Sequence, residues 1–204
     1  MDEVKTPFPK LRLSVINVYG ECYHGYKVGD EIILEDFTHP PKHFCLGLAH
    51  ALFPVIYALS FKAKFPFSEN QRALKVTCPD GGKLEFEVEV LDKKDGKVEF
   101  VAKDQNEKGP QPKRMRIEVV KAKGKCSFGY KVGDKWETVG LKCIPGFCGA
   151  AFHTAFPALF ALNFGAKFFF MDNSDSIDTV TCPDAGNIVF KITRLEDKAN
   201  NKSN

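Results

Sequence analysis

Residues 25–30 read Gly-Tyr-Lys-Val-Gly-Asp, and residues 129–134 of the same 204-residue chain read Gly-Tyr-Lys-Val-Gly-Asp again. A cysteine precedes each copy by three residues, Cys22 in the first and Cys126 in the second. The copies lie 104 residues apart, which is much longer than the ~20–50-residue period of solenoid repeats. The stretch therefore indicates a duplicated domain.

A second repeated motif is an apolar run that opens with a cysteine. Cys45 opens the run in the first half and His50 follows within it; Cys148 and His153 repeat the arrangement at an offset of 103 residues. Each run carries a proline near its middle. Such runs favour a helix that is buried on most sides and that the proline kinks or breaks.

The third motif is Val-Thr-Cys-Pro-Asp, found at residues 76–80 and again at residues 180–184. Its cysteines, Cys78 and Cys182, are 104 residues apart. All three motifs keep their order in both halves. One duplication with a single-residue slip therefore explains the whole pattern.

Composition and charge exclude several classes of function. The chain is 44% apolar and 27% charged with a formal charge of +3, which is ordinary for a globular protein and too weak to indicate a nucleic-acid partner. The two apolar runs are too short and too interrupted to indicate a membrane protein. The charged N-terminus lacks a secretion signal, so we expect a cytoplasmic protein whose seven cysteines are reduced thiols.

Alternating apolar and polar residues predict strands on both sides of each helix. Each half should read β-β-α-β-β, an α+β fold whose two repeats pack with pseudo-twofold symmetry. The chain is then a monomer acting as an internal pseudo-dimer, or a homo-oligomer. We expect repeat 1 at 10–102 with an additional strand at 97–102, a linker at 103–113, repeat 2 at 114–196 and a frayed tail at 197–204.

The combined motifs resemble an uncharacterised family of small bacterial and archaeal proteins. The resemblance rests on Gly-x-Cys-x-x-Gly-Tyr-Lys-Val-Gly-Asp, then Phe-Cys-x4-His-x3-Pro, then Thr-Cys-Pro-Asp, and it covers residues 11–91 and 115–195. Members of that family often contain a single copy of the domain. This chain therefore resembles a tandem duplication of such a member. The resemblance implies a shared fold and carries no activity.

The repeated cysteines are the candidate metal ligands. Each set comes from the ends of separate elements, where side chains from distant segments can converge on a soft ion such as Zn or Fe. The chain has no Cys-x-x-Cys pair, and duplication also copies cysteines that are only small buried hydrophobes. Both interpretations stay open for Cys22, Cys45, Cys78, Cys126, Cys148 and Cys182.

The repeated histidines are candidate ligand-binding residues. His50 and His153 each follow a helix-opening cysteine by five residues, about 140° around a regular helix. A cysteine and a histidine can therefore share a ligand only if the cysteine precedes the first helical turn. The alternative is that both histidines are satisfied residues of the core.

Cys45 and Cys148 differ from the other thiols because they are expected at helix N-termini. Unpaired amides there carry partial positive charge, which favours the thiolate and suits either ligation or nucleophilic attack. Three functions follow: a protein that binds a soft metal or a small molecule through thiols, a thiol enzyme that uses the repeat histidines as acid and base, or a structural or interaction protein with core cysteines. The sequence leaves open whether the protein is an enzyme.

Overall fold

The computed structural model describes residues 7–38, 41, 44–92, 96–103, 111–183 and 186–196. The chain divides into two compact units, Met1–Pro110 and Gln111–Asn204. The expected tail and most of the expected linker lie outside the described residues.

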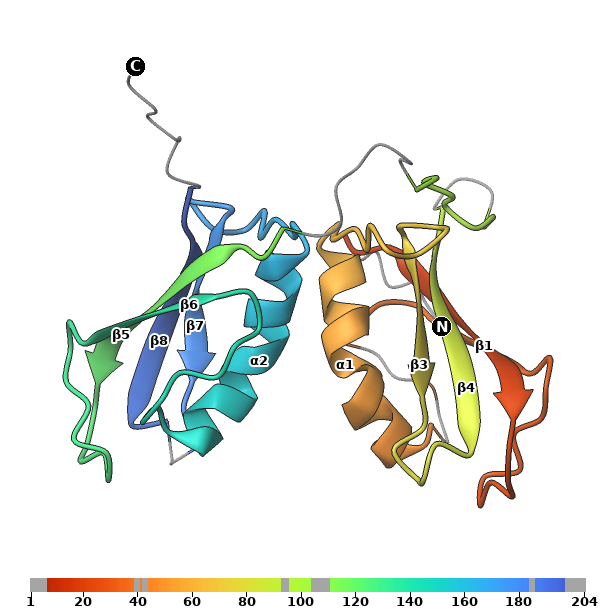
Figure 1. Cartoon of the computed structure of the whole chain (residues 1–204), viewed down its shortest axis with the longest axis horizontal. Helices are drawn as coiled ribbons and strands as arrows, with labels where there is room; N and C mark the ends of the chain where they lie inside the picture. The colour runs from red at the N-terminus through yellow and green to blue at the C-terminus, as the bar shows by residue number, and fades with distance from the viewer. Residues whose placement is uncertain are drawn as a thin grey trace. The chain divides into compact units, whose positions relative to one another are not determined.

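Unit 1 holds one four-stranded antiparallel sheet and one helix (Figure 1). The strands lie in the order β2-β1-β4-β3, so the two longest are central. The elements are β1 (Lys10–Val18), β2 (Glu31–Leu34), α1 (Leu46–Ser60), β3 (Ala73–Thr77) and β4 (Leu84–Leu91).

Unit 2 has the same element order and an equivalent sheet, β6-β5-β8-β7. Both central pairs shift register at the same place, after Val15 in β1 and after Val119 in β5. The predicted α+β class, with two strands on either side of each helix, is confirmed. The elements are β5 (Arg114–Ala122), β6 (Lys135–Val139), α2 (Gly149–Asn163), β7 (Ser176–Thr181) and β8 (Ile188–Arg194).

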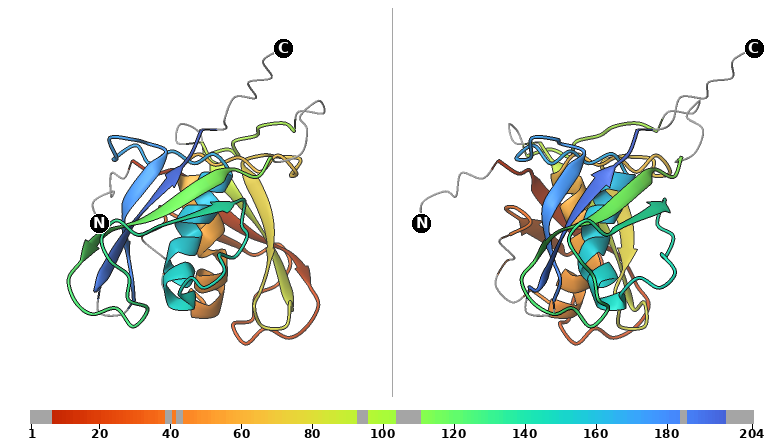
Figure 2. Two further views of the ribbon diagram at one scale, coloured as in Figure 1. Left: turned by 60° about the vertical axis from the view of Figure 1, so that its left-hand side comes forward. Right: turned by 90° about the vertical axis from the view of Figure 1, so that its left-hand side faces the viewer.

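Each sheet packs its helix against one face only (Figures 1 and 2). In β1, Leu11, Leu13 and Val15 are buried while Arg12 and Ser14 between them are partly exposed. Successive side chains of a strand point to opposite faces, so one face forms the core of the unit. The opposite face of the sheet carries charged residues.

The helices differ in two respects from the expectation. Leu48, Leu52 and Leu59 form a buried stripe, but Leu46 is 86% exposed and the N-terminal half of α1 is open on one side. The prediction of burial on most sides is therefore wrong for that half. The helix also continues through Pro54 without a break, as α2 does through Pro157.

A guanidinium, buried in unit 1 and half-buried in unit 2, caps the C-terminal end of each helix from a different position in each unit. Arg72 precedes β3 and donates to the carbonyls of Leu59 (3.1 Å) and Ala63 (2.7 Å). In unit 2, Arg194 at the end of β8 donates to Leu162 at 2.8 Å. Positive charge stabilises the negative end of a helix, so both arginines have the same role.

The pairing between strands shows that these two arginines occupy non-equivalent positions. The amide of Val90 bonds the carbonyl of Arg72, and the amide of Arg194 bonds the carbonyl of Asp175. Asp175 therefore stands where unit 1 has Arg72, and its carboxylate pairs with Arg194.

The additional strand expected at 97–102 does not form. The described residues of that segment make only two isolated bridges, Leu91 with Val98 and Asn70 with Ala102. Asn70 also holds the segment through its side chain, accepting from the Val101 amide at 3.1 Å. The backbone bonds of the segment go to two separate stretches, 90–92 and 69–71, so no continuous ladder forms.

Candidate functional site

The connection between the first two strands of each unit positions a tyrosine. Gly25 adopts φ 71° and its amide bonds the carbonyl of Cys22 at 2.9 Å, while the Asp30 carboxylate accepts from the amide of Lys27 at 2.8 Å. These contacts recur in unit 2 at Gly129 and Asp134. The conserved spacing within the chain is thus a folded loop that fixes the ring of Tyr26 or Tyr130.

The hydroxyl of this tyrosine binds the backbone at the start of the helix. The amide of Cys148 donates to the Tyr130 hydroxyl at 2.8 Å, and Tyr26 has the same bond with the backbone of Cys45. Both cysteines are N-cap residues in extended conformation and neither caps the helix through its side chain. A phenol that accepts one hydrogen bond still has its own hydrogen to donate.

The environment of the hydroxyl favours the protonated phenol. Burial raises the pKa of Tyr26, the hydrogen bond from the Cys45 backbone opposes the rise, and negative charge on Cys45 and Cys22 adds to it. Burial likewise raises the pKa of Tyr130, with Cys148 and Cys126 in the same roles. Each tyrosine therefore stays neutral close to two thiols.

The third cysteine reaches the same end of unit 1 through the turn between β3 and β4 (Figure 1). Gly47 lies in the first turn of α1. A Cβ atom placed on Gly47 would lie 3.7 Å from the side chain of Pro79, the residue after Cys78, and 3.9 Å from the sulfur of Cys45. The segments that carry Cys45 and Cys78 are therefore in contact.

Lys83 connects this turn to the Cys22 segment. Its backbone carbonyl accepts from the Tyr19 amide at 2.7 Å, and its side chain lies across Gly20, 3.1 Å from a Cβ position there. Asp80 raises the pKa of Lys83 through a 2.9 Å ion pair, burial opposes the rise, and Cys22 and Cys78 add to it. A cation therefore lies near two of the three thiols.

A shallow depression of about 500 Å³ opens beside Cys22 and Tyr26. Glycines form part of its floor, so backbone is accessible there. It is lined by Val18, Gly20, Glu21, Cys22, Gly25, Tyr26 and Lys27.

Unit 2 repeats the tyrosine and thiols but changes the charge. Asn187 takes the place of Lys83, and its side-chain amide donates to the Lys125 carbonyl at 3.4 Å. Cys182 is buried at 8% exposure, whereas its counterpart Cys78 is half-buried. The Tyr130 ring packs on Trp136 with centroids 4.6 Å apart.

The predicted metal ligands form no cage among the described residues. Within the described part of the chain, no group of three or more His, Cys, Asp or Glu side chains is arranged to hold a metal ion. All seven cysteines are free thiols. Of the six predicted ligands, five are half-buried and one, Cys182, is fully buried.

The repeated histidines lie on the surface of their helices. His50 and His153 are exposed, so the interpretation that they are core residues is wrong. Cys45 precedes the first helical turn, which is the geometry that a shared ligand requires. The described residues nevertheless contain no metal-holding group that joins a histidine to the cysteines.

The tyrosine hydroxyls and Lys83 are site residues that the sequence analysis did not identify. Tyr26 lies in the repeated hexapeptide, where its repetition was an available signal. Lys83 had no such signal, because unit 2 has asparagine there. Its contact with Gly20 and its backbone bond with Tyr19 show that it belongs to the site.

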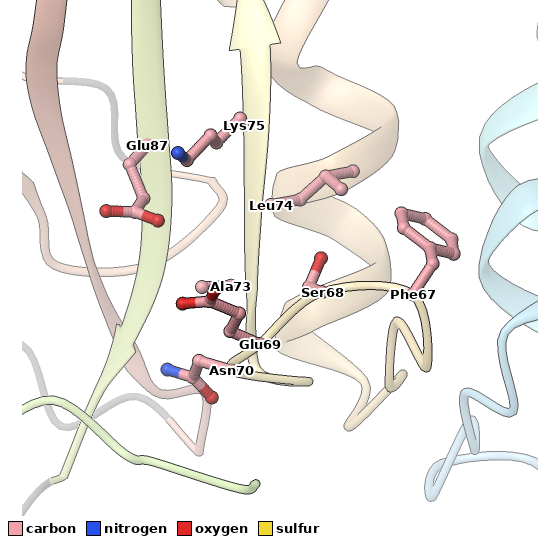
Figure 3. Close-up of a pocket in the computed structure, with 8 residues that line it drawn as sticks. All are labelled: Phe67, Ser68, Glu69, Asn70, Ala73, Leu74, Lys75 and Glu87. Atoms are coloured by element: carbon pink, nitrogen blue, oxygen red, sulfur yellow. The ribbon is translucent and has the colours of Figure 1, made fainter. Parts of the chain in front are cut away.

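A second pocket, of about 620 Å³, lies on unit 1 and is lined by residues other than the cysteines (Figure 3). Lys75 reaches from β3 toward Glu87 on β4, while Leu74 points away from them (Figure 3). Burial raises the pKa of Glu87, with Glu89 adding to the rise and Lys75 opposing it. The pocket is lined by Phe67, Ser68, Glu69, Asn70, Ala73, Leu74, Lys75 and Glu87.

Comparison of the chain with models of protein families, with curated proteins and with solved structures found no match. No helix among the described residues has the length and apolar character needed to cross a membrane.

Proposed function

We propose that each unit binds a soft metal ion or a small thiol-reactive molecule through its cysteines. The observation that carries this proposal is the tyrosine hydroxyl bound to the amide of the helix-start cysteine, Tyr26 to Cys45 and Tyr130 to Cys148. This bond fixes a neutral phenol next to two thiols in both units. Fixed polar groups beside a thiol orient a ligand and stabilise charge on sulfur.

Thiols without a preformed cage favour ligands that need few donors. A tetrahedral zinc ion requires four ligands at ~2.0–2.3 Å, and the described residues group no three such side chains. A Cu(I) ion or an electrophile needs only one to three sulfurs, and soft thiolates select Cu(I). Cu(I) is therefore the probe that fits the geometry best, with Zn and Fe as the other candidates.

The test is titration of reduced protein with Cu(I) under anaerobic conditions against a competing chelator. We expect Cys22→Ser and Cys45→Ser to weaken binding to unit 1, and Cys126→Ser and Cys148→Ser to weaken binding to unit 2. Cys143→Ser is the matched control, because Cys143 is exposed and has no counterpart in unit 1. Binding that survives in all four variants, or that disappears with Cys143, would refute the proposal.

A thiol enzyme is the second candidate, supported by the N-cap position of Cys45 and Cys148. If these thiols are nucleophiles, they should alkylate faster than Cys143 at neutral pH, as measured by mass spectrometry. Replacing His50 or His153 with Gln should remove that advantage if an imidazole assists. If Cys45 and Cys148 stay unreactive until the protein is denatured, the result would exclude the thiol enzyme and favour a structural or interaction role.

The finer features of the architecture are also proposals. We infer that the units are two copies of one β-β-α-β-β repeat, since their sheets share strand order and register shifts. We also propose, from the repeated sequence motifs, that the units pack about a pseudo-twofold axis. The same motifs support membership of the family of small bacterial and archaeal proteins. We also infer a cytoplasmic protein, because seven free thiols suit a reducing compartment.

A further inference from the structure

The open face of the unit 1 sheet, opposite α1, is acidic. Strand alternation places Glu85, Glu87 and Glu89 together on this face of the central strand β4. Among the described residues, carboxylates outnumber cations there: Glu31, Glu35, Glu85, Glu87 and Glu89 stand against Lys10, Arg12 and Lys75.

The corresponding face of unit 2 is basic. Glu87 is paired with Ser14, and at the same register Lys191 is paired with Glu118. Glu31 likewise corresponds to Lys135. Across the described part of this face the cations are Arg114, Arg116, Lys121, Lys135 and Lys191, against the carboxylates Glu118, Glu137 and Asp178.

Ion pairs within each face leave opposite charges at the two centres. Arg12 pairs with Glu89 at 2.8 Å and Glu31 at 3.2 Å, so those carboxylates are partly neutralised. Burial raises the pKa of Glu87, Glu89 and Glu69 add to the rise, and Lys75 and Arg12 oppose it without cancelling it. An approaching cation would relieve this charge. Lys191 holds the equivalent central position on the other sheet.

We propose that the open face of β2-β1-β4-β3 in one molecule docks on the open face of β6-β5-β8-β7 in a second copy, with Glu87 opposite Lys191 of that copy. The two sheets share strand order and register, so complementary positions recur at matching spacing. Sheets commonly pack face to face with their strands nearly aligned. The contact joins two different surfaces and is therefore heterologous, so it builds chains or rings larger than a dimer.

The proposed contact is small. Four strands ~4.8 Å apart and about five residues long cover roughly 300 Å² of sheet, less than the ~800 Å² per partner of a standard interface. Its charged character also makes it sensitive to salt. We therefore expect a weak association, with a dissociation constant on the order of 10–100 µM.

The first measurement is sedimentation of the reduced full chain at ~10 mM and ~1 M salt, where the Debye length is ~30 Å and ~3 Å. The average mass should rise with protein concentration at low salt and return to that of the monomer at high salt. Concentration dependence separates docking between copies from docking within one chain. A monomer under all conditions would overturn the proposal and leave the faces to partners of another kind.

Charge-reversal variants test the face assignment. Glu87→Lys and Lys191→Glu should each weaken association at least about tenfold. An equimolar mixture of the two should associate again, as should the double variant E87K/K191E, because each restores one opposite-charge pair. Lys64→Glu is the control, with the same charge change on an exposed residue of the connection between α1 and β3.

Three outcomes would contradict the assignment: association that neither variant changes, association that only one variant changes, and a mixture that fails to recover. Circular dichroism establishes that each variant folds. Should a reversal prevent folding, the neutral pair Glu87→Gln and Lys191→Gln gives the same test with a smaller change. Neither variant touches the thiol site, so the outcome is independent of metal or ligand binding.

Discussion

The hydroxyl of Tyr130 accepts a 2.8 Å hydrogen bond from the backbone amide of Cys148, the residue that precedes α2. The first amides of a helix lack partners within it, and a side chain from the residue at the N-cap usually supplies one. Here a residue from a distant loop supplies the partner just before the helix. The helix start, the thiol and the loop therefore depend on one phenol.

Removing that hydroxyl should destabilise unit 2. Tyr130→Phe keeps the ring contacts with Trp136 and Phe147 but leaves the Cys148 amide without its acceptor. We expect a loss of about 1 kcal/mol in the free energy of unfolding. Urea unfolding followed by the fluorescence of Trp136, the single tryptophan of the chain, measures it. Tyr23→Phe, at a residue 96% exposed, is the control and should change nothing.

Arg194 should contribute more than an ordinary surface arginine. Arg194→Leu removes the donor to the Leu162 carbonyl and leaves Asp175 paired only with Lys167 among the ion pairs described. We expect a loss of about 2–4 kcal/mol. Adding Asp175→Asn should recover part of it, because the unpaired carboxylate is then neutral.

The control for that experiment is Arg114→Leu, which removes an exposed pair with Glu137. Surface pairs are worth about 0–1 kcal/mol. Equal losses for Arg194→Leu and Arg114→Leu would show that the guanidinium at the helix end has no special role.

Alkaline pH should destabilise unit 1 through Tyr57. Burial raises the pKa of Tyr57 to about 12, above the ~10 of an unfolded chain. The stabilisation is complete below pH ~10, where both states are protonated, and is lost as the pH rises through ~12. The loss should approach about 3 kcal/mol.

Comparison of Tyr57→Phe with the unchanged protein isolates this contribution from that of the lysines. The phenylalanine variant should lose less stability between pH 10 and 12, and one fewer tyrosinate should appear late in the absorbance titration. Parallel curves for the two proteins would assign the alkaline loss to other groups.

Lys83 should make the thiols of unit 1 more reactive than those of unit 2. Its positive charge lies near Cys22 and Cys78, and unit 2 has Asn187 at that position. Lys83→Asn should slow alkylation of Cys22 and Cys78 about twofold to fivefold at low salt, and Asn187→Lys should speed that of Cys126. Cys143 is the internal reference in each digest. Identical alkylation rates before and after these substitutions would mean that solvent screens the charge of the lysine completely.

The order of elements could be predicted because it depends on local pattern. Alternation in residues 11–15 marks a half-buried strand, and the apolar run after Cys45 marks a helix. The strand expected at 97–102 did not form because its backbone bonds are divided between two separate stretches, 90–92 and 69–71, so no continuous ladder results. Propensity does not show which backbone a segment will meet.

Only some of the site residues could be predicted from the sequence. Repetition identified Cys45 and Cys148, and their position before the helix follows from where the apolar run begins. The bond from Tyr26 joins segments that are distant along the chain, and the role of Lys83 depends on its lying across Gly20. Exposure of the histidines depends on which faces of each helix are covered by other elements. The apolar pattern of the helix alone does not specify those faces.

The exchange of Arg72 for the Asp175–Arg194 pair means that strands of unit 1 and unit 2 cannot replace one another at this point. A recombination that joined Arg72 to the last strand of unit 2 would place two arginines at one helix end. The reciprocal product would combine Asp175 with Val90, leaving a carboxylate and the helix carbonyls with no arginine between them. Neither product should fold as well as its parents, so the two units are not interchangeable segment by segment at this point.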